Sequence, residues 1–239
     1  MRAPLETLDI PTEPMIRLTP RVLDQVFRSI ILPRQISLLH GSERAPLSII
    51  AHGVVVSAAR SLPDAKCVFL DSGTNYSPTL VRSICPSTDD ATEVLKRIVV
   101  SQVMGLSDVE YMIKRLSELE EVSVIILDSL TSTLNLTGAP GTKGRQRELF
   151  HTLEVIRKVV NNYNTHALIT DYSSKNWISG ELTPVGGNVL SHAVDSVVQI
   201  DRLRTNQGLI RILTERCTAS KNPPSIIVRA DSKGIRSMK

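Results

Sequence analysis

The chain has 239 residues, of which 41% are apolar, 22% charged and 3% aromatic, and its formal net charge is +4. This length is enough for one α/β domain with a full core, and the composition predicts a soluble globular protein. No apolar run approaches the roughly 18–20 residues that span a bilayer, so we expect no membrane partner. The three cysteines form neither a metal-ligand pair nor a disulfide framework, and the histidines have no ligand companions, so no metal site is predicted.

The first part of the chain predicts an arm followed by a capped helix. Residues 1–17 contain three prolines and are predicted to be an N-terminal arm or linker, and residues 18–239 the core domain. Apolar residues recur every three or four positions over 19–28, which predicts a helix. Thr19 is its expected N-cap and Pro20 its first helical residue.

The rest of the chain alternates between short apolar runs, typical of buried parallel strands, and helical patterns. Strands are predicted at 35–40, 66–71, 97–102, 122–128 and 166–171, and helices at 47–60, 78–84, 91–95, 107–120 and 145–162. Three further strands, with little helix between them, are predicted at 196–200, 209–213 and 225–229. The alternation predicts an α/β fold with a mostly parallel central sheet, helices on both faces and antiparallel C-terminal strands.

The turn after the first predicted strand has the spacing of a phosphate-binding loop. The strand ends at Gly41, and Ser48 follows after six residues, as in the pattern G-x-x-x-x-G-K-[S/T]. Pro46 stands where the pattern has its second glycine, and Leu47 stands where the pattern has its lysine. Leu47 cannot place a positive charge on the phosphates, whereas the glycine turn and the helix N-terminus remain. An ordinary strand–turn–helix crossover is the alternative reading of this segment.

Three further segments extend this pattern along the chain. Residues 18–27 read Leu-Thr-Pro-Arg-Val-Leu-Asp-Gln-Val-Phe, residues 124–130 are an apolar strand that ends in Asp-Ser-Leu, and residues 183–193 read Thr-Pro-Val-Gly-Gly-Asn-Val-Leu-Ser-His-Ala. Together with the degenerate loop, they resemble the RecA/RadA recombinase family, in particular archaeal RadA paralogues of the RadB and RadC type and eukaryotic recombinase paralogues. The resemblance spans roughly residues 18–236 and implies a RecA-like P-loop NTPase core.

The sequence departs from this family at the positions that carry the ATPase chemistry. Phosphoryl transfer needs charge on the phosphates, a held magnesium and an oriented water. The resemblance implies a water-activating glutamate after the second strand, but the residue there is Gly73. It also implies an Asn-Gln pair that senses the γ-phosphate, replaced here by Asp171 and Tyr172. Together with Leu47, these changes predict a pseudo-ATPase rather than an enzyme.

The resemblance also assigns what remains of a nucleotide site. Ser48 through its hydroxyl and Asp128 through water would hold magnesium, and Gly41 would provide the turn beneath the phosphates. We therefore expect a vestigial site at Gly41, Ser48 and Asp128, with no cofactor or at most weak binding of ATP and magnesium. Because the lysine is absent, an alternative interpretation is that Asp128 is a carboxylate at the strand end that caps the next turn.

Two loops that hold DNA in this family correspond to residues 137–147 and 173–187. The first is rich in glycine and basic residues, and the second places a lysine beside an indole, which suits phosphate and base contacts of single-stranded DNA. The predicted DNA-binding residues are Lys143, Arg145, Arg147, Lys175 and Trp177. Solvated loops, with the indole folded onto the core or a partner, are the alternative.

The resemblance thus implies a non-catalytic accessory or mediator of homologous recombination and DNA repair. Its expected partners are single-stranded DNA and a recombinase or paralogue of the same fold, in the cytoplasm of an archaeon or the nucleus of a eukaryote. Two alternatives stay open. One is a DNA-stimulated ATPase with an unorthodox site in which Arg44 replaces the lysine, and the other is a structural interaction subunit without DNA contact.

Overall fold

The computed structural model describes residues 16–119, 121–175, 180, 182–203, 208–218 and 225–238. Its strands are β1 (Ile36–Gly41), β2 (Lys66–Asp71), β3 (Ile98–Gln102), β4 (Val122–Asp128), β5 (His166–Lys175), β6 (Leu182–Pro184), β7 (Ser196–Arg202), β8 (Leu209–Arg216), β9 (Ser225–Asp231) and β10 (Gly234–Arg236). Its helices are α1 (Arg21–Phe27), α2 (Arg44–Ser61), α3 (Pro78–Ile84), α4 (Thr88–Arg97), α5 (Leu106–Lys114), the 3₁₀ helix η1 (Arg115–Glu118), α6 (Leu130–Leu136), α7 (Lys143–Asn162) and α8 (Gly187–Ala193).

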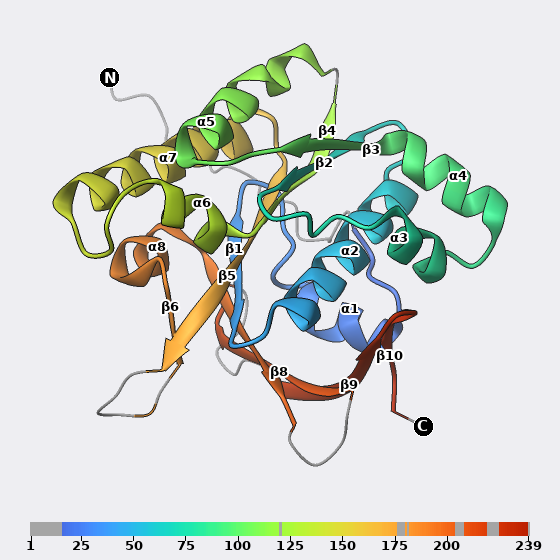
Figure 1. The fold of residues 1–239 in the computed structure, drawn as a ribbon. Coiled ribbons are helices and arrows are strands. Elements are labelled where there is room, and N and C mark those ends of the chain that lie inside the picture. Colours follow the sequence, from blue (N-terminus) through green and yellow to red (C-terminus); the bar gives the residue numbers. More distant parts are fainter. Residues whose placement is uncertain are drawn as a thin grey trace, which may run out of the picture.

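One twisted sheet runs through the molecule (Figure 1) in the order β10-β9-β8-β7-β1-β5-β4-β2-β3, and β6 pairs with β5. The strands from β7 to β3 are parallel to one another, while β8, β9 and β10 follow antiparallel beyond β7. This confirms the predicted α/β fold. Every residue of β1 and β4 is buried, because parallel strands inside such a sheet are covered on both faces.

The core consists of two layers, one on each face of the sheet. Leu39 and Phe69 point toward α1, α2, α3 and α4, and their neighbours Leu38 and Leu70 point toward α5, α6, α7 and α8. Successive side chains of a strand alternate between the two faces, so each strand contributes to both layers. The arrangement confirms the prediction of helices on both faces.

The start of the domain differs from the prediction. α1 begins at Arg21, and the residue before it is Pro20, so the predicted cap by Thr19 is wrong. The backbone N–H of Thr19 instead donates to Ser57 Oγ in α2 at 3.3 Å. Ile16 is already buried, so the chain packs against α2 from the first residue that the structure describes.

Several short elements were not predicted, namely α6, α8, β6 and β10. The helix predicted at 107–120 is divided into α5 and η1, and β5 continues to Lys175. α7 begins at Lys143, two residues earlier than predicted, where the Thr142 hydroxyl accepts from the backbone N–H of Arg145. Within the described residues, no helix is long and apolar enough to cross a membrane.

Candidate functional site

The predicted vestigial site lies where the carboxyl ends of four parallel strands meet. Gly41 ends β1, Asp71 ends β2 and Asp128 ends β4, with Asp71 and Asp128 paired in register. Asp171 of β5 lies beside His40 of β1. Ligands of open α/β sheets bind outside the carboxyl ends of the strands, so this edge is where the fold would hold a nucleotide.

The turn between β1 and α2 is shorter than the loop that the sequence predicted. Only Ser42 and Glu43 separate β1 from α2, because the helix begins at Arg44. Pro46 is its third residue, a position where the missing N–H would have had no helical partner anyway. Leu47 is 0% exposed and packs into the core layer beneath α2. Burying this side chain is worth about 2 kcal/mol, which favours a helix at the place where a phosphate would need an open loop.

Ser48 and Asp128, which the resemblance assigns to magnesium, bind each other instead. The Ser48 hydroxyl donates to Asp128 Oδ2 at 2.6 Å, and the Thr170 hydroxyl donates to Oδ1 at 2.7 Å. Asp128 is 1% exposed, and this burial raises the pKa of its carboxyl group, against the two hydrogen bonds that lower it. The structure thus brings Ser48 and Asp128 together, and both carboxylate oxygens of Asp128 accept hydrogen bonds from the chain itself.

Gly41 also has a role in packing. A Cβ atom at this position would lie 2.4 Å from the carbonyl oxygen of Ile200 in β7. Since such a distance is far below van der Waals contact, only glycine allows β1 and β7 to approach here. The glycine would be needed with or without a phosphate above it.

At the end of β2, hydrogen bonds within the chain fix the turn that follows the strand. Asp71 Oδ1 accepts from the backbone N–H groups of Gly73 at 3.1 Å and Asn75 at 2.8 Å, so this carboxylate shapes the turn after β2. The guanidinium of Arg44 donates to the carbonyl oxygen of Gly73. Arg44, the proposed substitute for the lysine, therefore bridges the mouth of the site from α2 to the β2–α3 turn.

His52 belongs to this site, although the sequence analysis gave it no role. Its Nδ1 lies 2.7 Å from the carbonyl oxygen of Ser48, and its Nε2 accepts from the backbone N–H of Ser77 at 2.9 Å. Burial lowers the pKa of His52, which favours the neutral ring that this pattern requires. Its spacing of four residues from Ser48 was the available signal, since residues i and i+4 share one face of a helix.

Asp171 and Tyr172 occupy the positions of the γ-phosphate sensor. The Thr131 hydroxyl donates to Asp171 Oδ1, and the backbone N–H of Gly186 donates to Oδ2 at 2.9 Å. Burial raises the pKa of Asp171 to about 6. The backbone N–H of Tyr172 donates to the Thr131 hydroxyl at 2.8 Å, so this pair is held by the chain itself.

The first predicted DNA-binding segment is partly a helix. Lys143, Arg145 and Arg147 all lie in the first turns of α7 and not in a mobile loop, because Thr142 caps the helix just before them. Lys143 and Arg147 are exposed. Arg145 is only 7% exposed and donates from Nη1 to the carbonyl oxygen of Gly138 at 3.4 Å, so the structure separates this residue from the two exposed cations.

The second predicted segment begins as a hairpin. Lys175 is the last residue of β5 and pairs with Leu182 of β6, so its backbone belongs to a strand. Trp177 lies outside the described residues. At the base of the hairpin, Ser173 Oγ lies 2.8 Å from Nδ1 of the buried His40, whose Nε2 lies 3.1 Å from Glu215 Oε2.

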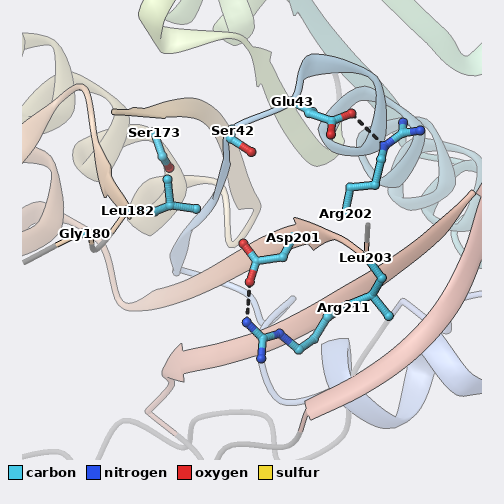
Figure 2. Close-up of a pocket in the computed structure, with 9 residues that line it drawn as sticks. All are labelled: Ser42, Glu43, Ser173, Gly180, Leu182, Asp201, Arg202, Leu203 and Arg211. Carbon is cyan, nitrogen blue, oxygen red and sulfur yellow. Dashed lines mark hydrogen bonds and ion pairs between the residues drawn. The ribbon is translucent and has the colours of Figure 1, made fainter. Parts of the chain in front are cut away.

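A cavity of about 720 Å³ opens beside this hairpin (Figure 2). Two ion pairs line it, between Glu43 and Arg202 at 2.7 Å and between Asp201 and Arg211 at 2.6 Å. Each guanidinium faces a carboxylate, so these pairs leave no net charge to attract a phosphate. The hydroxyl of Ser173 lies at the hairpin side of the same cavity.

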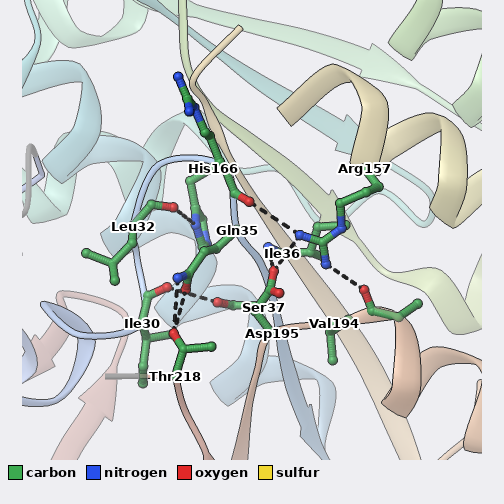
Figure 3. Close-up of polar contacts among 12 residues, drawn as sticks. Ile30, Leu32, Gln35, Ile36, Ser37, Arg157, His166, Val194, Asp195 and Thr218 are labelled. Atoms are coloured by element: carbon green, nitrogen blue, oxygen red, sulfur yellow. Dashed lines mark hydrogen bonds and ion pairs between the residues drawn. The ribbon is translucent and has the colours of Figure 1, made fainter. Parts of the chain in front are cut away.

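The opposite end of the sheet is fixed by a separate polar network (Figure 3). Asp195 Oδ2 accepts from the backbone N–H of Ile36 and from Arg157 Nη1, both at 2.7 Å. His166 Nδ1 donates to the carbonyl oxygen of Leu32 at 2.8 Å, and burial lowers the pKa of His166 to about 4. These contacts hold β1, β5 and α7 together at their far ends and leave the carboxyl edge as the candidate site.

The order of the strands and the glycine turn after β1 define a RecA-like P-loop NTPase core. A family model of Rad51 matches residues 14–236, and the chain belongs to this family. The predicted resemblance is therefore confirmed.

The similar proteins are named as repair and recombination proteins. The DNA repair and recombination proteins RadB of Thermoplasma acidophilum and Thermoplasma volcanium are 22% and 24% identical over 167 and 174 residues, which cover 68% and 71% of this chain and 70% of each relative. The DNA repair protein RAD51 of Mycosarcoma maydis is 21% identical over 198 residues, 76% of this chain and 58% of that protein. A crystal structure of the RadB recombinase has the same fold, with a TM-score of 0.75 at 16% identity over 91% of this chain and 96% of that one.

Proposed function

We propose that this protein is a non-catalytic member of the Rad51 family that acts as an accessory or mediator in homologous recombination and DNA repair. It binds single-stranded DNA, a recombinase or paralogue of the same fold, or both. The observation that carries the proposal is the hydrogen bond between Ser48 and Asp128 beneath a helix that already begins at Arg44. The groups that would hold magnesium are joined to each other, and the loop that would hold phosphates is helical.

Opening this site for magnesium and ATP has a substantial cost. The first turn of α2 must unwind and expose Leu47, at about 2 kcal/mol, and the Ser48 and Thr170 bonds to Asp128 must break, at about 1 kcal/mol each. A total near 4 kcal/mol weakens binding about a thousandfold. No lysine is present in the loop to offset this, and Gly73 offers no side chain to orient a water, so we expect no hydrolysis.

The surface supports a role in binding a protein partner. Four large apolar side chains are 56–64% exposed on α5, α6, α7 and the segment before α5, namely Met104, Tyr111, Leu136 and Phe150. α5 and α7 pack against each other, so these side chains belong to one side of the domain. Exposed apolar surface of this kind is typical of interaction sites.

The test compares three activities of the purified chain. We expect no phosphate release from ATP with or without single-stranded DNA, salt-dependent binding of a labelled oligonucleotide, and association with the recombinase or a paralogue from the same source. DNA-stimulated turnover that Asp128→Asn abolishes would refute the non-catalytic role and favour an ATPase that uses Arg44. Association with the recombinase but no oligonucleotide binding would indicate a structural subunit instead.

A further inference from the structure

Three polar side chains from different strands form a hydrogen-bonded chain at the wall of the 720 Å³ cavity. The hydroxyl oxygen of Ser173 lies 2.8 Å from Nδ1 of His40, and Nε2 of the same ring lies 3.1 Å from Oε2 of Glu215. Ser173 lines the cavity (Figure 2), whereas His40 is 0% exposed. A hydroxyl group, an imidazole and a carboxylate in this order are the parts of a nucleophilic site, in which the carboxylate orients the base and the base activates the hydroxyl.

The sheet brings these three side chains together from distant parts of the sequence. Asp171 of β5 pairs with His40 of β1, and Ser173 is two residues further along β5, so its side chain lies on the same face as that of Asp171. On β8, the residues on either side of Glu215 pair with two successive residues of β7, which leaves Glu215 as the extra residue of a β-bulge. Its carboxylate reaches across β7 to His40. Bulges re-aim side chains and are over-represented beside active sites.

The hydrogen bonds determine which nitrogen of His40 acts as the base. An ionised carboxylate only accepts hydrogen bonds, so Nε2 of His40 carries the proton that is shared with Glu215. In this tautomer Nδ1 has a free lone pair, and the Ser173 hydroxyl group donates to it. The hydroxyl at the cavity is therefore already hydrogen-bonded to an unprotonated base, at a distance that allows proton transfer.

The cavity supplies the remaining parts of such a site. Ser42 and Glu43, the two residues before α2, line it together with Ser173. The first N–H groups of a helix have no partner within the helix, so this end of α2 is a source of donors for an oxyanion. The two ion pairs of the wall leave no net charge, and Leu182 and Leu203 add apolar surface. These features favour a small, uncharged substrate.

We propose that this cavity is an esterase site for small, uncharged carboxylic esters, with Ser173 as the nucleophile, His40 as its base and Glu215 as the residue that positions His40. The Ser173 hydroxyl gives its proton to Nδ1 of His40 while Oγ bonds to the carbonyl carbon of the ester. The bond from that carbon to the alcohol oxygen then breaks, and His40 returns the proton to the leaving alcohol. A water molecule, deprotonated in turn by His40, releases the acyl group as a carboxylic acid and restores the hydroxyl. This activity goes beyond the proposed role in recombination and needs no nucleotide.

The test combines covalent labelling of the intact protein by an alkyl fluorophosphonate with hydrolysis of p-nitrophenyl acetate. The fluorophosphonate reacts with activated serines, because the serine oxygen bonds to phosphorus and fluoride leaves. We expect mass spectrometry of the intact protein and of its peptides to find one label, on Ser173, and the labelled protein to lose ester hydrolysis. Absence of a label on Ser173 overturns the proposal. A labelled protein that hydrolyses the ester as fast as the unlabelled one also overturns it.

Two matched variants separate the proposed nucleophile from an ordinary surface serine. Ser173→Ala and Ser174→Ala remove the same hydroxyl group from neighbouring residues of β5, the first at the cavity and the second exposed. We expect Ser173→Ala to lose the label and to hydrolyse the ester about a hundredfold more slowly, and Ser174→Ala to change neither. Equal ester hydrolysis by the two variants overturns the proposal.

A third variant separates a catalytic arrangement from a purely structural network. Glu215→Gln keeps the size of an exposed side chain but no longer fixes the proton on Nε2 of His40. We expect the rate of labelling at Ser173 to fall about a hundredfold in protein that circular dichroism shows to be folded. An unchanged rate would mean that the three side chains only hold β1, β5 and β8 together, and the proposal would then fail.

Discussion

Replacing Leu47 by lysine tests whether burial of Leu47 keeps the predicted phosphate loop helical. In Leu47→Lys, a side chain that is 0% exposed is replaced by a charge that the core cannot accommodate. Loss of the buried leucine costs about 2–5 kcal/mol, and unwinding of the first turn of α2 frees Ser48 from Asp128 at about 1 kcal/mol more. We therefore expect the free energy of unfolding, measured with urea, to fall by about 3–6 kcal/mol.

The same variant should gain a response to nucleotide. With the turn open and a lysine present, magnesium and ATP at about 100 times the dissociation constant return about 2.7 kcal/mol of stability. Ala45→Lys is the matched control, because it adds the same charge in the same turn at an exposed position. We expect it to change neither the free energy of unfolding nor the effect of magnesium and ATP on it. Two outcomes would refute the reasoning. One is that magnesium and ATP stabilise the unaltered protein as much as they stabilise Leu47→Lys. The other is that Leu47→Lys has the same free energy of unfolding as the unaltered protein.

Three further outcomes follow from the structure. Gly41→Ala places a Cβ 2.4 Å from the Ile200 carbonyl oxygen, so we expect a loss of about 2 kcal/mol or more in urea unfolding, which an unchanged midpoint would disprove. His166 has a pKa of about 4 when folded and about 6.5 when unfolded, so its neutral form stabilises the fold above pH 6.5. That contribution declines by about 3 kcal/mol as the pH falls to 4, and His166→Gln should lack this decline in urea titrations across pH. Lys143→Gln and Arg147→Gln should each reduce the slope of log affinity for single-stranded DNA against log salt by about 0.7, and an unchanged slope would remove these residues from the DNA contact.

The parallel strands were predictable because each is a short apolar run, and a strand covered on both faces leaves a strong signal in the sequence. The short elements were not. β10 has three residues and α8 has seven, and α8 begins at Gly187 with a φ of 61°. Elements of this length depend on the neighbours they pack against, which a local pattern does not contain.

The sequence predicted which residues lie at the candidate site, but not the hydrogen bonds that they make with one another. The order of the strands places Ser48 near Asp128, because both follow parallel strands at one edge. Their direct hydrogen bond and the start of α2 at Arg44, three residues before the predicted start, leave no such signal in the sequence. The charge pattern grouped Arg145 with Lys143 and Arg147 as DNA-binding residues, since no local signal reveals that its long side chain folds back toward Gly138.

The substitutions in the phosphate loop reinforce one another physically. Leu47, at the lysine position, packs in the core, and the helix that carries it begins at Arg44 and is longer than predicted. The longer helix places Arg44 over the Gly73 carbonyl oxygen, and the absent glutamate leaves room for that contact, since a Cβ at Gly73 would lie 3.2 Å from Arg44 Nη2. Restoring the glutamate alone would therefore crowd Arg44 without opening the cradle, and restoring the lysine alone would open the cradle without a group to orient water. If the proposed non-catalytic role holds, we expect hydrolysis to be recovered only by a variant that carries both the lysine at position 47 and the glutamate at position 73.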